Sequence, residues 1–339
     1  MIDLLTIADE QEIADTIARK LAETYPVSRF RVPAHDRPTA DDTVLSTLAE
    51  MGTLGLGVPE TAGGLGLGCA IEALAFREYG RFLVSPAILG TIMAARIAAA
   101  AGDETRAGDL VSGRTRVGVG IAAIGEGGRL DGDVQLFELG PERLFVLWNE
   151  AGAGLYNIDA LACRVVKGLD ETLTMEVAAN SKLDPLLWVD ASSEPLPLFA
   201  SLFSASLMVG MGEAARDMAV EYAKTREQYG KPIGHFQAVA HKCADMALHL
   251  EAAWCETIYA ALDMQEGGAG APFHVLNAKI LAAKALLAAA KENIQIHGGM
   301  GYTTEVPAHH FMKRGHVLSE IGGSARQVRT RLLDLPFVS

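Results

Sequence analysis

The chain has 339 residues, half of them hydrophobic, so it is long enough for two or three structural units around a sizeable core. Its formal net charge of −13 argues against nonspecific binding to nucleic acid, which needs a basic surface, and gives no attraction to anionic lipid. The cysteines show no C-x-x-C pair and no zinc-ligand spacing, which indicates buried thiols in a reducing environment rather than a disulfide framework; they are Cys69, Cys163, Cys243 and Cys255.

The amino-terminal residues bear on location. Residues 1–12 are acidic and amphipathic, without the basic start and apolar centre of a signal peptide. Pro86 and Arg96 interrupt the longest apolar stretch, residues 83–101. We therefore expect a cytoplasmic protein without a membrane span.

Helical spacing dominates the first 110 residues, which we interpret as an N-terminal helical domain. Ile13, Ile17 and Leu21 fall on one face of the first predicted helix. The predicted helices cover residues 6–24, 41–51, 70–79 and 85–101, with Gly80 separating the last two.

Residues 52–68 are too rich in glycine to form a helix and lie between predicted helices. A glycine-rich stretch can bind phosphate, but this one lacks the Gly-Lys-Ser/Thr ending and the G-x-G-x-x-G register. We expect a connecting loop without chemistry of its own.

Short β-branched segments follow, and we interpret residues 111–190 as a small β domain. Gly118-Val-Gly120 mimics a dinucleotide-binding motif, but residues 125–132 are too rich in glycine to open the helix that must bind the pyrophosphate. The predicted strands are residues 116–121, 134–137, 144–148, 154–158 and 174–177.

Residues 191–339 return to helical spacing and form the third predicted domain. Helices are expected over residues 199–211, 213–226 and 277–296, with another beginning near Phe236. Arg226, at a helix C-terminus, could either offset the helix dipole or bind a phosphate. The glycines after residue 296 could either terminate the helix or let a ligand approach the backbone.

Two segments of this third region closely resemble the C-terminal signatures of the acyl-CoA dehydrogenases, flavoenzymes that oxidise acyl-CoA thioesters to 2-enoyl-CoA. They are residues 222–237, YAKTREQYGKPIGHFQ, and residues 295–304, QIHGGMGYTT. Residues 52–68 resemble the family's Leu-Gly-Val-Pro-Glu-x-x-Gly-Gly-Leu-Gly loop. The resemblance implies a mainly α fold with a small central β domain between an N-terminal helical domain and a C-terminal four-helix bundle.

The resemblance also implies a cofactor, FAD, and the residues that contact it. In the family, residues matching Arg226, Tyr229, Gln237, Gln295 and Gly299 reach across a dimer interface to the FAD of the neighbouring subunit. Gln228 and Gly298, in the same two segments, complete the predicted cofactor-binding set.

The catalytic base of the family is missing. Counting from Pro307 without a gap places Gly322 where the family usually has its glutamate. A minority position for the base matches Ala200. Glu320 lies two residues from the usual position and is a weak candidate; a surface carboxylate pairing with Arg314 or Arg326 is the simpler interpretation. We therefore predict no catalytic residue in this chain.

The β domain also departs from the family. Residues 122–128, AAIGEGG, replace the Leu-Thr-Glu-Pro-x-x-Gly-Ser-like segment that binds the flavin ring, and no Trp-Ile-Thr/Ser segment follows. The chain thus resembles the shortened subunit of two-gene, heterotetrameric acyl-CoA dehydrogenases that shorten steroid side chains. This implies a full-length dehydrogenase subunit as partner, an acyl-CoA substrate and an electron-transferring flavoprotein as acceptor.

Two alternatives remain open: a noncatalytic structural or regulatory homo-oligomer of the same fold, and a self-sufficient homo-oligomeric dehydrogenase with a displaced base such as Glu320. A metal centre is not expected, because no histidines form an H-x-x-x-H or H-E-x-x-H pair. We expect His297 to pack beside the FAD backbone. The remaining histidines are expected at the surface or at helix ends; they are His235, His241, His309, His310 and His316.

Overall fold

The protein is seen in a computed structural model that describes residues 8–32, 40–159 and 161–335. Its helices within these residues are α1 Ala8–Thr24, α2 Ala40–Glu50, α3 Cys69–Arg81, α4 Ala87–Ala100, α5 Glu104–Val111, α6 Leu196–Thr225, α7 Gln237–Gln265, α8 Ala271–His297, α9 Ala308–Glu320 and α10 Ala325–Asp334. Its strands are β1 Gly118–Ile121, β2 Leu130–Phe137, β3 Leu144–Asn149, β4 Gly152–Asn157, β5 Arg164–Val166, β6 Met175–Leu183, β7 Leu187–Asp190, β8 Glu227–Gln228 and β9 Lys231–Pro232.

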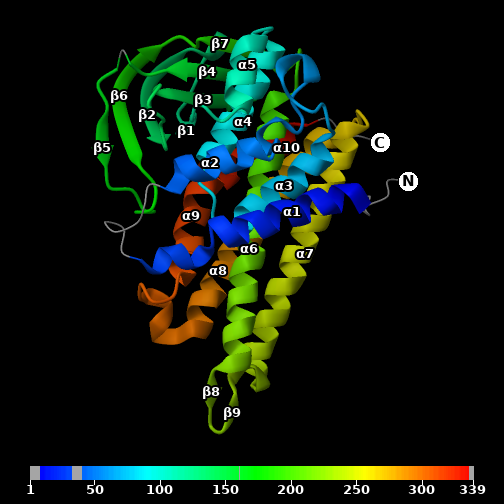
Figure 1. Cartoon of the computed structure of the whole chain (residues 1–339), viewed down its shortest axis with the longest axis vertical. Coiled ribbons are helices and arrows are strands. Elements are labelled where there is room, and N and C mark those ends of the chain that lie inside the picture. The colour runs from blue at the N-terminus through cyan, green and yellow to red at the C-terminus, as the bar shows by residue number, and fades with distance from the viewer. Residues whose placement is uncertain (1–7, 33–39, 160, 336–339) are drawn as a thin grey trace.

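The predicted fold class is confirmed: a small sheet lies between an N-terminal and a C-terminal group of helices. In Figure 1 the long helices α6, α7, α8 and α9 run side by side, and α1 and α3 cross them. The sheet lies at one end of this bundle, next to α4 and α5, and the β8–β9 hairpin projects from the other end. The domain boundaries at residues 110 and 190 stay predictions.

The central sheet has seven strands in the order β5-β6-β2-β1-β3-β4-β7. Among these seven strands, β1 and β3 pair in parallel, and all the other neighbouring pairs are antiparallel. Side chains alternate between the two faces of β3. Leu144, Val146 and Trp148 join the main core with the helices, whereas Phe145 and Leu147 join a second core on the other face.

Helix α6 is a single helix where two segments were predicted. Its glycines allow neighbouring elements to approach closely: a Cβ on Gly210 would lie 1.8 Å from the Arg77 carbonyl oxygen of α3. Gly80, predicted to separate two helices, lies inside α3, where a Cβ would lie 2.1 Å from the Leu207 carbonyl oxygen of α6. Glycine therefore serves close helix packing here rather than helix termination.

The glycine-rich residues 52–68 form a loop with two short 3₁₀ turns, η3 Thr53–Gly55 and η4 Glu60–Ala62. A Cβ on Gly57 would lie 2.2 Å from both Glu72 and Arg96, which form a buried ion pair. The loop thus packs directly on the ion pair that joins α3 and α4.

No predicted element covers α5, α9, α10, β5, β7, β8 or β9. The carboxylate of Asp103 caps α5 by accepting a hydrogen bond of 3.1 Å from the Arg106 N–H. By length and composition, α6 and the span Ala271–Tyr302 could each cross a membrane, but 83% and 56% of their apolar windows are buried inside the protein. As core helices of a folded protein also meet this criterion, the observation is weak evidence for a membrane span.

Candidate functional site

The two segments that carry the family resemblance meet at the end of the bundle remote from the sheet (Figure 1). Helix α6 leads into the β8–β9 hairpin, and α8 leads into a 3₁₀ turn, η7 Gly298–Tyr302. The Tyr222 ring of α6 stacks on the His297 ring of α8, with centroids 4.2 Å apart and planes inclined by 23°. The Tyr222 hydroxyl also lies 3.9 Å from the Met300 sulfur. The two segments therefore form one surface.

The hairpin is a two-residue turn in which both central residues have left-handed backbone. Tyr229 has a φ of +53° and Gly230 a φ of +76°, the arrangement that matches the twist of a tight hairpin. Glycine adopts this conformation readily, but tyrosine does so at a cost. The Tyr229 side chain is 92% exposed at the tip. A strained, fully exposed aromatic residue indicates that the hairpin is shaped for contact with something outside this chain.

Arg226 lies where α6 ends and the hairpin begins. Its N–H donates to the Tyr222 carbonyl oxygen and its carbonyl oxygen accepts from the Ile233 N–H, each at 2.8 Å. The side chain is exposed, and no carboxylate in the part of the chain that the structure describes lies within 4.0 Å of its guanidinium. The backbone is thus fixed while the guanidinium is available to an external anion.

The glycines after α8 have distinct roles. Gly298 has a φ of +60°, and a Cβ on either Gly298 or Gly299 would meet nothing within 4 Å. Gly301, in contrast, is required for packing, because its Cβ would lie 2.6 Å from the Ile294 carbonyl oxygen. Gly298 and Gly299 therefore present open backbone. Open backbone and an unpaired guanidinium suit an oxygen-rich anion such as a pyrophosphate.

All the residues predicted to bind the cofactor are exposed, and they come from the hairpin, the start of α7, the end of α8 and η7. They are Arg226, Gln228, Tyr229, Gln237, Gln295, Gly298 and Gly299. Their roles as ligands stay predictions. The α6–α8 stack between Tyr222 and His297 was not predicted, although both residues lie inside the two signatures.

A groove of about 540 Å³ lies beside this surface, and Tyr222, His297 and Met300 are among its lining residues. Burial lowers the pKa of His297, and its Nδ1 lies 2.9 Å from the Asn293 carbonyl oxygen. The neutral imidazole therefore donates from Nδ1 and serves as a flat packing surface for Tyr222.

The other histidines only partly follow the prediction. His235, His241 and His316 are exposed as expected. His310 is only 3% exposed and its ring lies 4.7 Å from that of Phe30, so its prediction as a surface or cap residue is wrong. It packs in the interior because α9 turns this face toward the N-terminal helices.

The predicted position of the missing base, Gly322, lies in the turn between α9 and α10. Gly322 has a φ of +71°, and a Cβ there would lie 2.4 Å from Nε1 of Trp148. Buried Lys279 of α8 holds the turn by donating to the carbonyl oxygens of Ile321 at 2.6 Å and Gly323 at 3.2 Å. Backbone conformation and packing both restrict position 322 to glycine. No distinct sequence signal pointed to this contact, because Lys279 is one of three lysines in the helix predicted over residues 277–296.

Neither alternative base position is suitable. Ala200 is fully buried in α6, and Glu320 is exposed at the end of α9. The suggested pairing of Glu320 with Arg314 is wrong, because the Arg314 guanidinium is buried and donates to Asp170 at 2.5 Å. Arg314 links α9 to the sheet region instead.

The segment predicted to replace the family's flavin-binding loop, residues 122–128, is also closely packed. Residues 126–128 form a 3₁₀ turn, and the Gly128 carbonyl oxygen accepts a hydrogen bond of 2.6 Å from the Tyr156 hydroxyl. A Cβ on Gly128 would lie 2.2 Å from the Trp188 ring. A hollow of about 610 Å³ beside this turn includes Glu126, Arg129 and Asp131 and has mixed charge.

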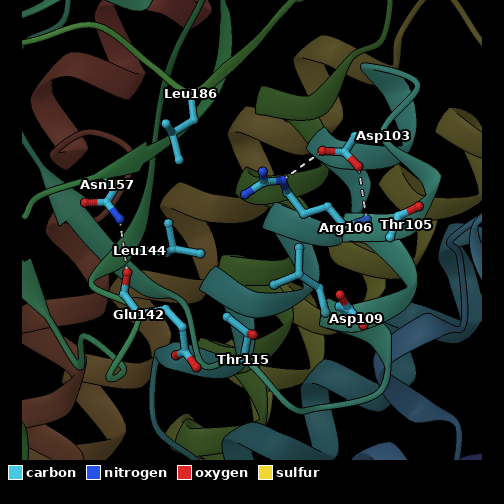
Figure 2. A pocket seen from close by; sticks show the side chains of 10 residues that line it. Asp103, Thr105, Arg106, Asp109, Thr115, Glu142, Leu144, Asn157 and Leu186 are labelled. Carbon is cyan, nitrogen blue, oxygen red and sulfur yellow. Dashed lines mark hydrogen bonds and ion pairs between the residues drawn. The ribbon is translucent and has the colours of Figure 1, made fainter.

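A further pocket, of about 440 Å³, lies between α5 and the sheet (Figure 2). Asp103, Asp109 and Glu142 give it an acidic lining, and Arg106 is already bound to Asp103 at 2.9 Å. It contains none of the predicted site residues. Its carboxylates oppose binding of an anionic CoA thioester.

Comparison with known proteins identifies the family. The family profile "Acyl-CoA dehydrogenase, N-terminal domain" matches residues 8–109, and "Acyl-CoA dehydrogenase, C-terminal domain" matches residues 202–333. The chain belongs to the acyl-CoA dehydrogenase family, whose members are flavin-dependent oxidoreductases. The predicted family is therefore confirmed.

Individual relatives share about 30% sequence identity or less over the length of this chain. Acyl-CoA dehydrogenase IpdE2 of Mycobacterium tuberculosis is 28% identical over 328 residues, which are 96% of either chain. Acyl-CoA dehydrogenase FadE34 of the same organism is 30% identical over 354 residues, which are 96% of this chain but 48% of FadE34.

Solved structures share the fold over nearly the whole chain. A chain of the ChsE4-ChsE5 complex from Mycobacterium tuberculosis has a TM-score of 0.81 and 23% identity, with 99% of this chain and 100% of that one covered. A variant of the Tcur3481-Tcur3483 steroid ACAD also has a TM-score of 0.81, with 22% identity and 96% and 97% covered. At these identities the likeness shows the fold alone.

Proposed function

We propose that this chain is the noncatalytic subunit of a two-component acyl-CoA dehydrogenase and completes the FAD site of a catalytic partner subunit. The reaction is the α,β-dehydrogenation of an acyl-CoA thioester. Bound FAD supplies the hydride acceptor for the β-carbon, and the partner's carboxylate takes the α-proton. This chain contributes binding groups for the dinucleotide.

The observation that carries the proposal is the contrast between two ends of the same bundle. At one end, Arg226 and the open backbone of Gly298 and Gly299 lie exposed on one surface. A guanidinium binds phosphate oxygens with a planar pair of donors, and the two glycines leave room for a ligand to approach the backbone. At the other end, Gly322 and its contact with Trp148 leave no room for the family's glutamate.

The relatives support a two-component arrangement. ChsE4-ChsE5 is a complex of two differently named chains, and the Tcur3481-Tcur3483 structure is likewise named after two components and described as a steroid ACAD. FadE34 leaves 52% of its length unmatched, 100% minus 48%, which is enough for a second unit of similar size. We propose a steroid side chain as the acyl group and an electron-transferring flavoprotein as the electron acceptor.

The test is co-expression with a full-length acyl-CoA dehydrogenase encoded beside this chain, followed by measurement of FAD dissociation from the purified complex. Arg226→Ala removes a charge-assisted phosphate contact and should weaken FAD binding by about 2 kcal/mol, or about 30-fold. Arg114→Ala is the matched control, because Arg114 is an exposed arginine that pairs with Asp109 beside α5, remote from the hairpin. It should leave FAD binding unchanged.

Equal FAD dissociation in the Arg226→Ala and wild-type complexes would contradict the proposed contact. The self-sufficient alternative predicts flavin and dehydrogenase activity in the chain purified alone. It is disfavoured because Glu320 is exposed, whereas a base that removes an α-proton works in a dry pocket.

A further inference from the structure

Three side chains with metal-binding atoms meet where α9 begins. His309 and His310 lie in the first turn of α9, and Glu171 comes from the loop between β5 and β6. Each offers one ligand atom, an imidazole nitrogen or a carboxylate oxygen, and the three atoms lie within 4.8 Å of one another. Two imidazoles and one carboxylate are a known ligand set for Zn²⁺, in which water takes the fourth tetrahedral position.

The two imidazoles are held together although they belong to consecutive residues. Neighbouring side chains on a helix point about 100° apart. Here the ring centroids of His309 and His310 are nevertheless 4.1 Å apart, with planes inclined by 38°. The His310 ring also lies 4.7 Å from that of Phe30, in the short 3₁₀ helix η1 Val27–Arg31. Packing against the N-terminal helices therefore supports this arrangement of the rings.

One nitrogen of the pair has no evident partner. The Nδ1 atom of His309 is buried, and within the described residues it makes no hydrogen bond of good geometry, although the Val306 backbone lies near the ring. A buried polar atom without a partner costs free energy, so its placement needs an explanation. A metal ion at this nitrogen would supply the partner, because the neutral imidazole is the commonest metal ligand among side chains.

The third side chain, Glu171, has a counter-ion that it can exchange. Its carboxylate oxygens accept from the Lys313 ammonium at 2.7 Å and 2.6 Å. Both side chains of this pair are about 30% exposed, so the pair contributes little to stability. The adjacent Asp170 is buried and accepts from Arg314 at 2.5 Å. That second pair fastens the loop to α9 by itself, so Lys313 can leave Glu171 without releasing the loop.

A Zn²⁺ ion at this place has to displace the Lys313 ammonium, because the positive end of the α9 dipole and two cationic side chains already surround the carboxylates. Ligand atoms about 2.0–2.2 Å from a tetrahedral zinc ion are about 3.4 Å from one another. The three atoms therefore need to approach by at most about 1.4 Å, which side-chain rotation can supply once Glu171 is released.

We propose that Glu171, His309 and His310 form a zinc site that fastens the loop before β6 to the start of α9, with Zn²⁺ replacing Lys313 as the counter-ion of Glu171. The inference goes beyond the proposed function and does not depend on it. The spacing of histidines along one helix could not reveal such a site, because the third ligand comes from another element.

The test titrates Zn²⁺ into the full chain after removal of bound metal by EDTA, with an indicator dye as competitor. We expect one Zn²⁺ per chain. Glu171→Gln and His309→Ala should each weaken binding by about 10-fold or more. Glu171→Gln keeps the test valid if His309→Ala does not fold, because Glu171 is exposed. His316→Ala and Glu320→Gln are the matched controls, because both are exposed residues farther along α9, and they should leave the affinity unchanged.

Lys313→Met separates this site from nonspecific binding at surface histidines. It should tighten Zn²⁺ binding by about 3-fold, because the metal no longer competes with the ammonium group. Absence of zinc binding, equal affinity in wild type and Glu171→Gln, or weaker binding by Lys313→Met would overturn the proposal. Co²⁺ gives a second readout: a visible spectrum with a thiolate charge-transfer band would place the metal at a cysteine and would also overturn it.

Discussion

At the scale of single residues, Gly322, the predicted position of the family's base, is restricted to glycine in two ways. Its left-handed backbone and its contact with Trp148 each favour glycine. A glutamate introduced here would meet the indole before it reached any substrate. The position is therefore more than a single substitution away from a catalytic base.

We predict that Gly322→Glu does not give the isolated chain dehydrogenase activity and lowers its stability. The cost should be about 1–3 kcal/mol or more, from the backbone conformation and the clash with the indole. A dye-linked assay with short-chain and steroid acyl-CoA thioesters, together with a thermal melt, provides the measurement. Turnover by this variant alone would show that the space is open.

Lys279 gives a prediction about pH. Burial lowers its pKa from 10.5 to about 7. Between pH 7 and pH 10.5 the unfolded chain binds a proton at this residue that the folded chain does not, so its contribution to the free energy of unfolding rises with pH by up to about 1.4 kcal/mol per unit. Below pH 7 both states are protonated and the contribution is constant.

The measurement compares urea unfolding of the wild type and Lys279→Met from pH 7 to pH 10. The difference in free energy of unfolding should move in favour of the wild type as pH rises, because methionine cannot titrate. Curves that stay parallel over this range would show that Lys279 keeps its ordinary pKa in the folded protein.

Counting from Pro307 places the family's base position at Gly322, and this placement stays a prediction. The contact with Trp148 could not be predicted, because the two residues lie in elements that only the folded chain brings together. The same limit explains the error for Arg314, because its partner Asp170 lies in a loop before β6, far from α9 in the sequence.

At the scale of elements, the β8–β9 hairpin combines strain with exposure. The sequence predicted a helix ending at Arg226 and another beginning near Phe236, but not the left-handed conformation of Tyr229 between them. Such strain persists when the residue has a role outside its own fold. The hairpin is therefore expected to favour assembly at the expense of the stability of the isolated chain.

We predict that Tyr229→Gly raises the stability of the isolated chain by about 1 kcal/mol, because glycine adopts a positive φ without strain. The same change should weaken assembly with the partner and retention of FAD. Thermal unfolding and size-exclusion chromatography of the co-expressed complex measure the two effects.

Asn180→Gly is the control, because Asn180 is exposed in β6 with a φ of +49° and lies away from the hairpin. It should relieve backbone strain without affecting assembly. If Tyr229→Gly leaves assembly intact, or affects it no more than Asn180→Gly does, the hairpin is not part of the shared interface.

Helical periodicity identified many of the helices. The corrections to their bounds share one physical cause, which is close packing at glycines. Gly80 was predicted to separate two helices, and α6 was predicted as two segments that meet at Gly212, but the structure uses both glycines, together with Gly210, for close contact between α3, α6 and α7. A glycine that permits a close approach and a glycine that ends a helix look the same in sequence. The short elements α5, β5 and β7 were missed because each has too few residues to show a period, and no helix was predicted over the residues of α9 and α10.

At the scale of the whole molecule, the chain is asymmetric. One end of the bundle exposes the predicted FAD contacts, and the end near the sheet is closed by packing between β3 and the α9–α10 turn. A homo-oligomer built only from this chain would bring dinucleotide contacts together without a base for proton removal. The asymmetry therefore favours a partner subunit that supplies the base for proton removal.

The most direct test of this account is the visible absorption spectrum of the chain purified alone and of the complex purified after co-expression with a full-length acyl-CoA dehydrogenase. We expect no flavin absorption from the chain alone, and one FAD for each pair of chains in the complex. A flavin bound by the chain alone, with acyl-CoA-dependent bleaching of its absorption, would contradict the account.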